Sequence, residues 1–351
     1  MTLVQSRPGR IKIAQEACEQ IDLCAGAVLN ALTLAAVRKL RERRISISGN
    51  MPKTSEAAEI VAATGLPKEL GVQLPVEFTH FKNHGLVHGW FTGDKATRSS
   101  RGDIEVTRLI DYLNDCLRGY GFEFSEEGND RIGELVAEVI NNCEDHSGRH
   151  EWWISAYLRQ PSGKEYGDCH ITVFNLGASL AETLQKLPAD SVLRRDIDRL
   201  MQHHEDRGHF RSGVFTREAA WTICALQPRV SCYNTGPYSV QDRGQGTVKM
   251  MEAFHRLGQV RKMRERPAMA LVSGRTHIRF DNTYTLKLLP IVGADTKEII
   301  AFNPENDLNL PPDRKYVSTL KNSFPGTILS LRFFIDPGHL ETVPDYASKT
   351  H

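Results

Sequence analysis

Residues 131–146, RIGELVAEVINNCEDH, have the pattern that most restricts the fold of this chain. Apolar residues recur there at intervals of three and four, which predicts a helix with a single apolar stripe about 140° wide, packed on a core. The stripe consists of Ile132, Leu135, Val136, Val139, Ile140 and Cys143. Glu138 and Asn142 lie one helical turn apart just outside its edge, and Glu134 and Asp145 extend the same polar strip.

A carboxylate and a carboxamide in this position suit phosphate chemistry. The Asn142 oxygen can ligate Mg²⁺, a hard cation that prefers oxygen ligands and keeps some of its water. The Glu138 carboxylate can accept a proton from a nucleophile that attacks a phosphate, or can orient a water molecule. The alternative is an ordinary solvated helix face, because a Glu and an Asn four residues apart also arise by chance.

Length and charge exclude several classes of protein. The chain has 351 residues, 44 Lys and Arg against 43 Asp and Glu, and a net charge of +1. This length suits two domains, and 40% apolar with 25% charged residues is a globular composition. The even balance of charge argues against a nucleic-acid-binding coat and against a polybasic membrane anchor.

The cysteines and the apolar runs indicate a cytoplasmic protein. Seven cysteines are scattered without a CxxC pair, so the sequence predicts reduced thiols, mostly buried, and neither a zinc ribbon nor a thioredoxin site. The first residues, MTLVQSRPGR, lack the apolar core of a signal peptide. The run from Leu23 to Val37 is too short and too polar to span a bilayer, and it is interpreted as a buried helix.

Residues 11–75 are predicted to form a small α/β unit. A helix is expected over 23–41, a strand over 45–49, a turn at 50–52, and a second helix capped by Ser55 and ending at Ala63. This helix–strand–helix order resembles part of a STAS domain, the partner-switching module of bacteria. A generic α/β cap is the alternative. The polar segment 93–102 is predicted to be a turn at the domain boundary, followed by a helix over 104–119.

Three further segments follow the 131–146 helix in a defined order. Strands are expected over 151–160 and 169–174, and the second ends in Asn175-Leu-Gly177-Ala-Ser179, where a polar side chain and close backbone can hold a planar base. The glycine-rich segment Asp242-Arg-Gly-Gln-Gly-Thr247 runs directly into a helix over 248–257 and offers backbone N–H groups to phosphate. Phe324-Pro-Gly326-Thr327 leads into an alternating strand over 328–335.

These elements, in this order, resemble the Bergerat-fold ATP-binding domain of the GHKL superfamily (gyrase, heat-shock chaperone, histidine kinase, MutL). The resemblance covers about residues 104–336, and the Glu138…Asn142…His146 form is most similar to histidine kinases and anti-sigma-factor serine kinases. It implies an α/β sandwich, a mixed sheet with helices on one face, preceded by the small α/β domain. The expected division is 1–100, 101–340 with a long lid insert over 185–243, and a tail over 341–351.

The resemblance also implies the roles of individual residues. Glu138 matches the general base and Asn142 the Mg²⁺ ligand. Asn175 stands where the family has the aspartate that accepts a hydrogen bond from the adenine amino group, and Gly177 matches the glycine after it. Thr327 matches the threonine that helps to hold the base. ATP phosphates would be held by the loop of Arg243, Gly244, Gln245, Gly246 and Thr247.

Two departures from the family pattern matter. The chain has NxGxS in place of DxGxG, with Asn175 for Asp and Ser179 for the second Gly. An Asn oxygen can still accept from adenine, but its amide could also turn to meet a guanine-like acceptor. About 70 residues separate Asn175 from Gly244, and the insert, helical and polar over 196–217, would be a long mobile lid.

Other candidate sites are weaker. Cys143, His146 and His150 have helical spacing that could bind zinc, although Cys143 belongs to the apolar stripe. His80, His84, His88, His203 and His204 are interpreted as solvent-exposed or core histidines. The basic run 256–266 is interpreted as a solvated helix end, with contact to nucleic acid or to a partner as the alternative.

Three functional hypotheses remain open. The first is an ATP–Mg²⁺-dependent enzyme, an ATPase or an anti-sigma-like kinase that phosphorylates a protein; no histidine helix of the sensor-kinase type precedes the domain. The second is a nucleotide-gated interaction module with little turnover, and the third a scaffold that has lost nucleotide binding. Expected partners are ATP and a protein, with a STAS-like protein as one candidate; the family also suggests a homodimer, whereas neither membrane nor nucleic acid is expected.

Overall fold

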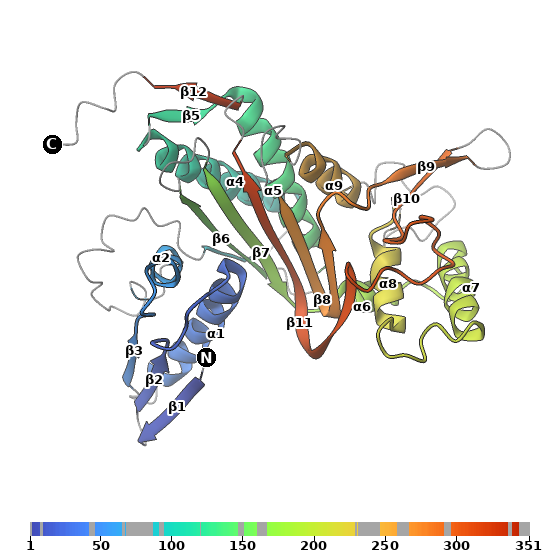
Figure 1. The fold of residues 1–351 in the computed structure, drawn as a ribbon, viewed down its shortest axis with the longest axis horizontal. Coiled ribbons are helices and arrows are strands. Elements are labelled where there is room, and N and C mark those ends of the chain that lie inside the picture. The colour runs from blue at the N-terminus through green and yellow to red at the C-terminus, as the bar shows by residue number, and fades with distance from the viewer. Residues whose placement is uncertain are drawn as a thin grey trace.

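The fold is mixed α/β, as predicted, and is built around one central sheet (Figure 1). The structure is a computed structural model of the chain. It describes residues 2–7, 10–41, 46–64, 67, 87–90, 95–119, 121–146, 151–159, 167–228, 230, 246–257, 267–290, 296–335 and 339–343.

The central sheet has five strands in the order β4 (Val87–Trp90), β6 (Glu151–Arg159), β7 (Asp168–Leu176), β11 (Val317–Phe334) and β8 (Ala268–Phe280). Its described pairings are all antiparallel, so the prediction of a mixed sheet is wrong for this part of the chain. The short connection between β6 and β7 requires an antiparallel pair, since a parallel pair needs a long crossover. The strands expected at 151–160, 169–174 and 328–335 are confirmed, and the last one is much longer than expected.

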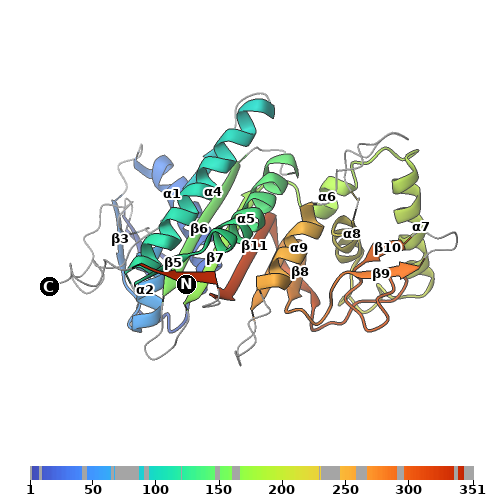
Figure 2. The same cartoon turned by 90° about the horizontal axis from the view of Figure 1, so that it is seen from above.

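Three helices cover one face of this sheet: α4 (Lys95–Arg118), α5 (Glu126–His146) and α9 (Gly246–Leu257) (Figure 2). The predicted stripe of α5 is confirmed, because its apolar side chains from Ile132 to Ile140 are at most 5% exposed. Helix α4 begins at Lys95 rather than at 104, so residues 95–102 are not the predicted polar turn. A polar segment without proline can extend an exposed helix, and α4 therefore runs through the predicted boundary at residues 100 and 101.

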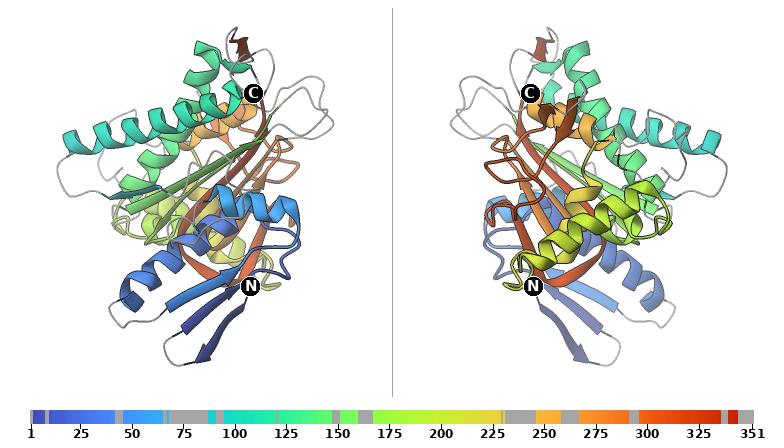
Figure 3. Two further views of the ribbon diagram at one scale, coloured as in Figure 1. Left: turned by 90° about the vertical axis from the view of Figure 1, so that its left-hand side faces the viewer. Right: turned by 90° about the vertical axis from the view of Figure 1, so that its right-hand side faces the viewer.

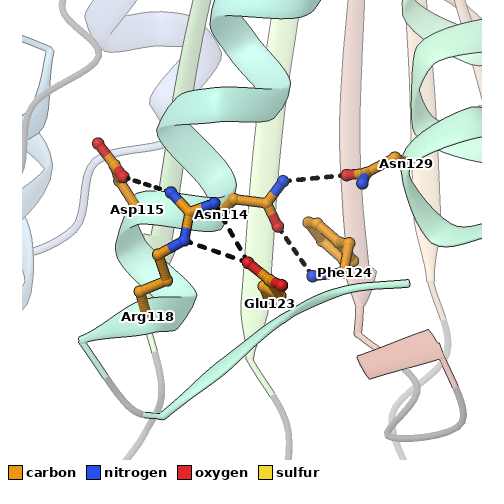
Figure 4. Close-up of polar contacts among 6 residues, drawn as sticks. All are labelled: Asn114, Asp115, Arg118, Glu123, Phe124 and Asn129. Carbon is orange, nitrogen blue, oxygen red and sulfur yellow. Dashed lines mark hydrogen bonds and ion pairs between the residues drawn. The ribbon is translucent and has the colours of Figure 1, made fainter. Parts of the chain in front are cut away.

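A short ladder closes the end of this helical layer. Strand β5 (Phe122–Phe124) pairs with β12 (Leu340–Thr342), so residues 341 and 342 belong to the fold and not to the predicted tail. The buried Asn114 of α4 fixes β5 in place, as Figure 4 shows: its Oδ1 accepts from the Phe124 N–H at 2.8 Å, and its Nδ2 donates to Asn129 Oδ1 at 3.0 Å. Both halves of one amide thus join α4, β5 and α5.

The N-terminal unit has the predicted helix–strand–helix order, α1 (Leu23–Arg41), β3 (Ser46–Asn50) and α2 (Ser55–Ala63). Two strands that the sequence analysis did not predict precede it, β1 (Thr2–Arg7) and β2 (Arg10–Ala14), with β2 parallel to β3. The predicted cap is wrong by one residue. Thr54 occupies the N-cap position, its hydroxyl donates to the Glu19 carbonyl, and Ser55 donates to Glu59 instead.

This unit covers the second face of the central sheet, a packing that the sequence did not predict. Ala27 and Ala31 of α1 form a buried cluster with Phe174 of β7 and Ile328 of β11. Tyr157 of β6 donates a hydrogen bond of 2.9 Å to Glu59 of α2. Figure 3 shows the N-terminal unit, in blue, across the sheet from α4. Small alanine side chains let α1 approach the sheet closely, and the apolar residues beneath it require such a cover.

The described part of the predicted lid, residues 185–228 and 230, is packed into a helical subdomain. It contains α7 (Val192–Asp206) and α8 (Arg217–Ala225), and α6 (Leu180–Leu184) precedes it. It packs on the connection between β8 and β11, which includes β9 (Lys287–Pro290) and β10 (Thr296–Ile299) (Figure 1). Buried polar contacts join the subdomain to this connection and to β8. The Gln227 amide donates to the Ile300 carbonyl at 2.8 Å, and the Thr222 hydroxyl lies 3.3 Å from that of Thr276.

Candidate functional site

The predicted site residues on strands meet in one row across three neighbouring strands. Thr327 of β11 lies opposite Asn175 of β7 on one side and opposite Ser273 of β8 on the other. The Thr327 N–H donates to Asn175 Oδ1 at 3.0 Å, and the hydroxyl oxygens of Thr327 and Ser273 are 2.8 Å apart. We call Asn175, Thr327 and Ser273 the polar row.

The polar row lies on the face of the sheet that α5 covers. Side chains alternate between the two faces of a strand. Val173, Leu271 and Leu329, each two residues from a member of the row, belong to the main core with the α5 stripe. Their neighbours Phe174 and Ile328 point the other way, toward α1. The row therefore faces the layer of Glu138 and Asn142, which are both half-buried.

Glycine permits the close strand approach at this row. Gly326 has φ of 142°, and a Cβ added there would lie 2.1 Å from the Asn175 carbonyl oxygen. The Gly177 N–H donates to the Pro325 carbonyl at 3.0 Å, which ties the segment after β7 to the same part of β11. The predicted site glycine Gly177 is thus beside the polar row, held by backbone.

Ser179 has a structural role at the start of α6. It is the N-cap of α6, where its hydroxyl accepts from the Glu182 N–H and the Glu182 carboxylate accepts from the Ser179 N–H. This reciprocal capping box satisfies two of the backbone donors at the helix start. The next N–H, that of Leu180, donates to the Ser273 hydroxyl at 2.8 Å, so α6 is fastened to the polar row.

Helix α9 meets α5 at the predicted general base. Lys249, in the first turn of α9, has its Nζ 3.5 Å from Glu138 Oε1, and the Glu138 side chain is 22% exposed. Gly246 is the first residue of α9, as expected for a glycine-rich turn that opens a helix. Arg243, Gly244 and Gln245 lie outside the described residues, as does the side chain of Thr247.

Chain connectivity puts these parts at one end of the sheet. Phe174 is paired with Trp153 near the start of β6, and the end of α5 is joined to that start by residues 147–150. The C-terminal half of α5 therefore comes to the end of the sheet where Asn175 lies. The structure thus joins Asn175 directly to Thr327, joins Glu138 to α9, and sets both pairs on the same face.

Large pKa shifts occur at described groups that are not among the predicted site residues. Burial raises the pKa of the Cys24 thiol to about 12, which makes it a poor nucleophile. Asp168, at the opposite end of β7, is buried, which alone would raise its pKa. Its hydrogen bonds to His170 and Arg332 outweigh burial and hold the pKa well below the usual range.

The described residues offer few ligands for a metal ion. Among the described residues, no group of three His, Cys, Asp or Glu side chains could hold a metal ion. The zinc alternative cannot be placed here, since the side chains of Cys143, His146 and His150 lie outside the described ones. A single oxygen ligand such as Asn142 fits Mg²⁺ that is shared with phosphates, because this ion binds through few protein ligands and keeps several waters.

The remaining predictions concern the histidines, the cysteines, membrane-spanning helices and the basic run. His204 is buried and His203 half-buried, as expected for core histidines, and the described part of the chain has no disulfide. Among the described residues, none of the helices combines the length and hydropathy that a bilayer crossing requires. Residues 258–266 of the basic run, with His80 and His84, lie outside the described residues.

Ser273 and Lys249 belong to the site but were not predicted from the sequence. Ser273 ends the apolar run of residues 268–272 and stands next to a glycine, a signal similar to the polar residues near glycines at 175 and 327. Lys249 had no such signal, because its partner Glu138 is more than 100 residues away in the chain.

Comparison of the chain with models of protein families, with curated proteins and with solved structures finds no match.

Proposed function

We propose that this protein binds a nucleoside triphosphate with Mg²⁺ in a GHKL-type site and either hydrolyses it or transfers its γ-phosphate to a protein. ATP is the nucleotide that the family resemblance implies. In this proposal Glu138 is the general base and Asn142 the metal ligand. The polar row and Gly177 hold the base, and residues 243–247 hold the phosphates.

The arrangement of elements supports a Bergerat fold as the finer assignment. An antiparallel sheet with α4, α5 and α9 on one face contains the predicted motif segments in the predicted order. Asn175, near the end of β7, lies directly opposite Thr327 in the neighbouring strand β11, as a shared base-binding site requires. The N-terminal unit would be the partner-binding part, and its STAS-like character stays a prediction.

One observation supports this proposal most strongly: the hydrogen bond of 3.0 Å between the Thr327 N–H and Asn175 Oδ1. The two residues are 152 positions apart, and the family resemblance implies one base-binding site for both. Asn175 and Ser273 are buried, and a buried polar atom without a protein partner is costly, so such a row suits a polar ligand.

The charges around α5 suit phosphate chemistry. Lys249 lies beside Glu138 at the start of α9, where backbone N–H groups and the helix dipole favour an anion. Glu138 keeps partial access to solvent, so it could accept a proton from water or from a hydroxyl. Bound Mg²⁺ would neutralise phosphate charge, and Asn142, one turn further along α5, would supply it with an oxygen ligand.

The second candidate function is a nucleotide-gated interaction module with little turnover. The packing of α1 favours it, because Ala27 and Ala31 contact Phe174 and Ile328, the immediate neighbours of Asn175 and Thr327. A ligand that shifts the polar row on one face would press on α1 on the other. The N-terminal unit could then change its affinity for a partner. A cytoplasmic location, a protein partner and a homodimer stay predictions.

Turnover and binding in matched variants separate these functions. Glu138→Gln should lower phosphate release or partner phosphorylation about 10²- to 10⁴-fold while leaving nucleotide affinity within threefold. Glu134→Gln, one turn earlier on α5 and exposed, is the control and should keep wild-type turnover. Binding without turnover in the wild type would favour the interaction module. A protein whose melting temperature does not change with any nucleotide and Mg²⁺ would contradict both functions and leave a scaffold.

A further inference from the structure

The hydrogen bonds of the polar row determine which atoms it can offer to a ligand. A backbone N–H can only donate, so the Asn175 atom that faces the Thr327 N–H must be Oδ1. This bond fixes the orientation of the amide. Among the described residues, Asn175 Nδ2 has no acceptor, although the residue is only 3% exposed. The Asn175 atom without a described partner is therefore a donor.

The two hydroxyls add another donor. Ser273 Oγ accepts from the Leu180 N–H at 2.8 Å and shares one hydrogen with Thr327 Oγ1. Whichever hydroxyl donates in that pair, one hydroxyl hydrogen is used and the other remains. Asn175 Oδ1 and Ser273 Oγ each accept from a backbone N–H, whereas the amide hydrogens and one hydroxyl hydrogen have no acceptor among the described residues.

We infer that the base bound by the polar row is a 6-oxopurine, as in GTP or ITP, and that ATP is the weaker ligand. This inference rests on the proposed nucleotide site and changes only the identity of the base. A 6-oxopurine presents the acceptor O6, whereas adenine presents an amino donor at the same place. Asn175 Nδ2 can donate to O6, but it would stand donor against donor with the adenine amino group.

The choice of asparagine over aspartate at position 175 determines whether the row offers a donor or an acceptor to the base. An aspartate would keep one oxygen for the Thr327 N–H and present its second oxygen where Asn175 now has Nδ2. That second oxygen would accept from the adenine amino group. The isosteric change Asn175→Asp therefore converts the free atom from a donor to an acceptor while keeping the bond that holds β7 to β11.

Calorimetric titration of the full chain with the Mg²⁺ salts of GTP, ITP and ATP tests the inference. GTP and ITP should each bind at least tenfold more tightly than ATP, because a buried polar mismatch typically costs a factor of ten or more. Asn175→Asp should reverse the preference, so that ATP binds at least tenfold more tightly than GTP. Asn322→Asp, which adds the same charge at an exposed position of β11, is the control and should keep the wild-type preference.

Each other outcome overturns the inference in a distinguishable way. ATP binding as tightly as GTP, or more tightly, refutes the 6-oxopurine but leaves the proposed function intact. GTP binding with ITP as weak as ATP means that the 2-amino group, not O6, is recognised. If no nucleotide binds, the proposed function fails together with this inference. The wild-type ratios decide alone if Asn175→Asp does not give a folded protein, as judged by circular dichroism.

Discussion

Lys249 Nζ lies 3.5 Å from Glu138 Oε1, which joins the first turn of α9 to the middle of α5. The lysine side chain is 61% exposed, so this ion pair adds little to folding stability. Its position beside the predicted phosphate loop gives it a second possible partner, a bound phosphate. Lysine serves as a point charge in many phosphate sites.

Replacement of Lys249 should therefore separate stability from binding. Lys249→Ala should change the free energy of unfolding by less than about 1 kcal/mol, while triphosphate affinity falls about five- to tenfold because a phosphate contact is lost. Affinity for the corresponding nucleoside should stay unchanged. Lys321→Ala, at an exposed position of β11, should alter neither quantity. Equal losses for nucleoside and triphosphate would show that Lys249 does not contact phosphate.

Gly326 should tolerate no side chain. A Cβ there would lie 2.1 Å from the Asn175 carbonyl oxygen, and φ of 142° is itself unfavourable for other residues. Gly326→Ala should lower the free energy of unfolding by about 3 kcal/mol or more, and should also weaken nucleotide binding, since it separates β7 from β11. Chemical denaturation measures the first effect.

The control for this substitution is Gly213→Ala. Gly213 also has a positive φ, of 66°, but nothing lies within 4 Å of an added Cβ. Only the backbone penalty remains, about 1 kcal/mol. Equal effects of the two substitutions would mean that the close strand approach at the polar row does not exist.

Asn114 should be more important for stability than its ion-paired neighbour Asp115 (Figure 4). Asn114→Ala leaves the Phe124 N–H without its acceptor and Asn129 without its donor, which should cost about 2–3 kcal/mol. Asp115→Ala removes a largely exposed ion pair to Arg118, and should cost less than about 1 kcal/mol. Thermal denaturation compares them, and a larger loss for Asp115→Ala would contradict this assignment.

His204 should make stability depend on pH. Burial disfavours the imidazolium and lowers the pKa most; the Leu308 carbonyl and Asp307 raise it, His209 and His203 lower it, and the resulting pKa is about 4. Its Nε2 is 2.9 Å from the Leu308 carbonyl and must donate to it, so Nδ1 accepts from His209. Protonation of Nδ1 would break that bond.

The direction of this pH dependence follows from the pKa values of His204 in the folded and unfolded states. In the unfolded chain the pKa is near 6.5, so the unfolded state binds the proton first as the pH falls. The stability that neutral His204 contributes is present above pH 6.5 and is lost between about pH 6.5 and 4. Urea denaturation across this range should show a loss for the wild type that is absent in His204→Gln. His203→Gln should retain it, and an identical profile for all three proteins would refute the role of His204.

Local patterns in the sequence determined the helices and the faces they bury. The stripe from Ile132 to Ile140 predicted α5, because a period of 3.6 residues records which side of a helix is apolar. The family resemblance implies that Asn175 and Thr327 share a site, and the strand register makes them direct neighbours. Segment ends were less certain, as α4 shows, since a polar sequence fits both a turn and an exposed helix.

Only the tertiary structure decided how distant segments pair. Cross-strand register aligns Ser273, Thr327 and Asn175, and a shift by one residue would turn each side chain to the other face. The position of α1 on the second face of the central sheet also depended on the tertiary structure, because the contact of Ala27 with Phe174 joins segments almost 150 residues apart. The orientation of the Asn175 amide was fixed in the same way. The sequence determined that an amide stands there, whereas the neighbouring backbone N–H of Thr327 decided which of its atoms is left for a ligand.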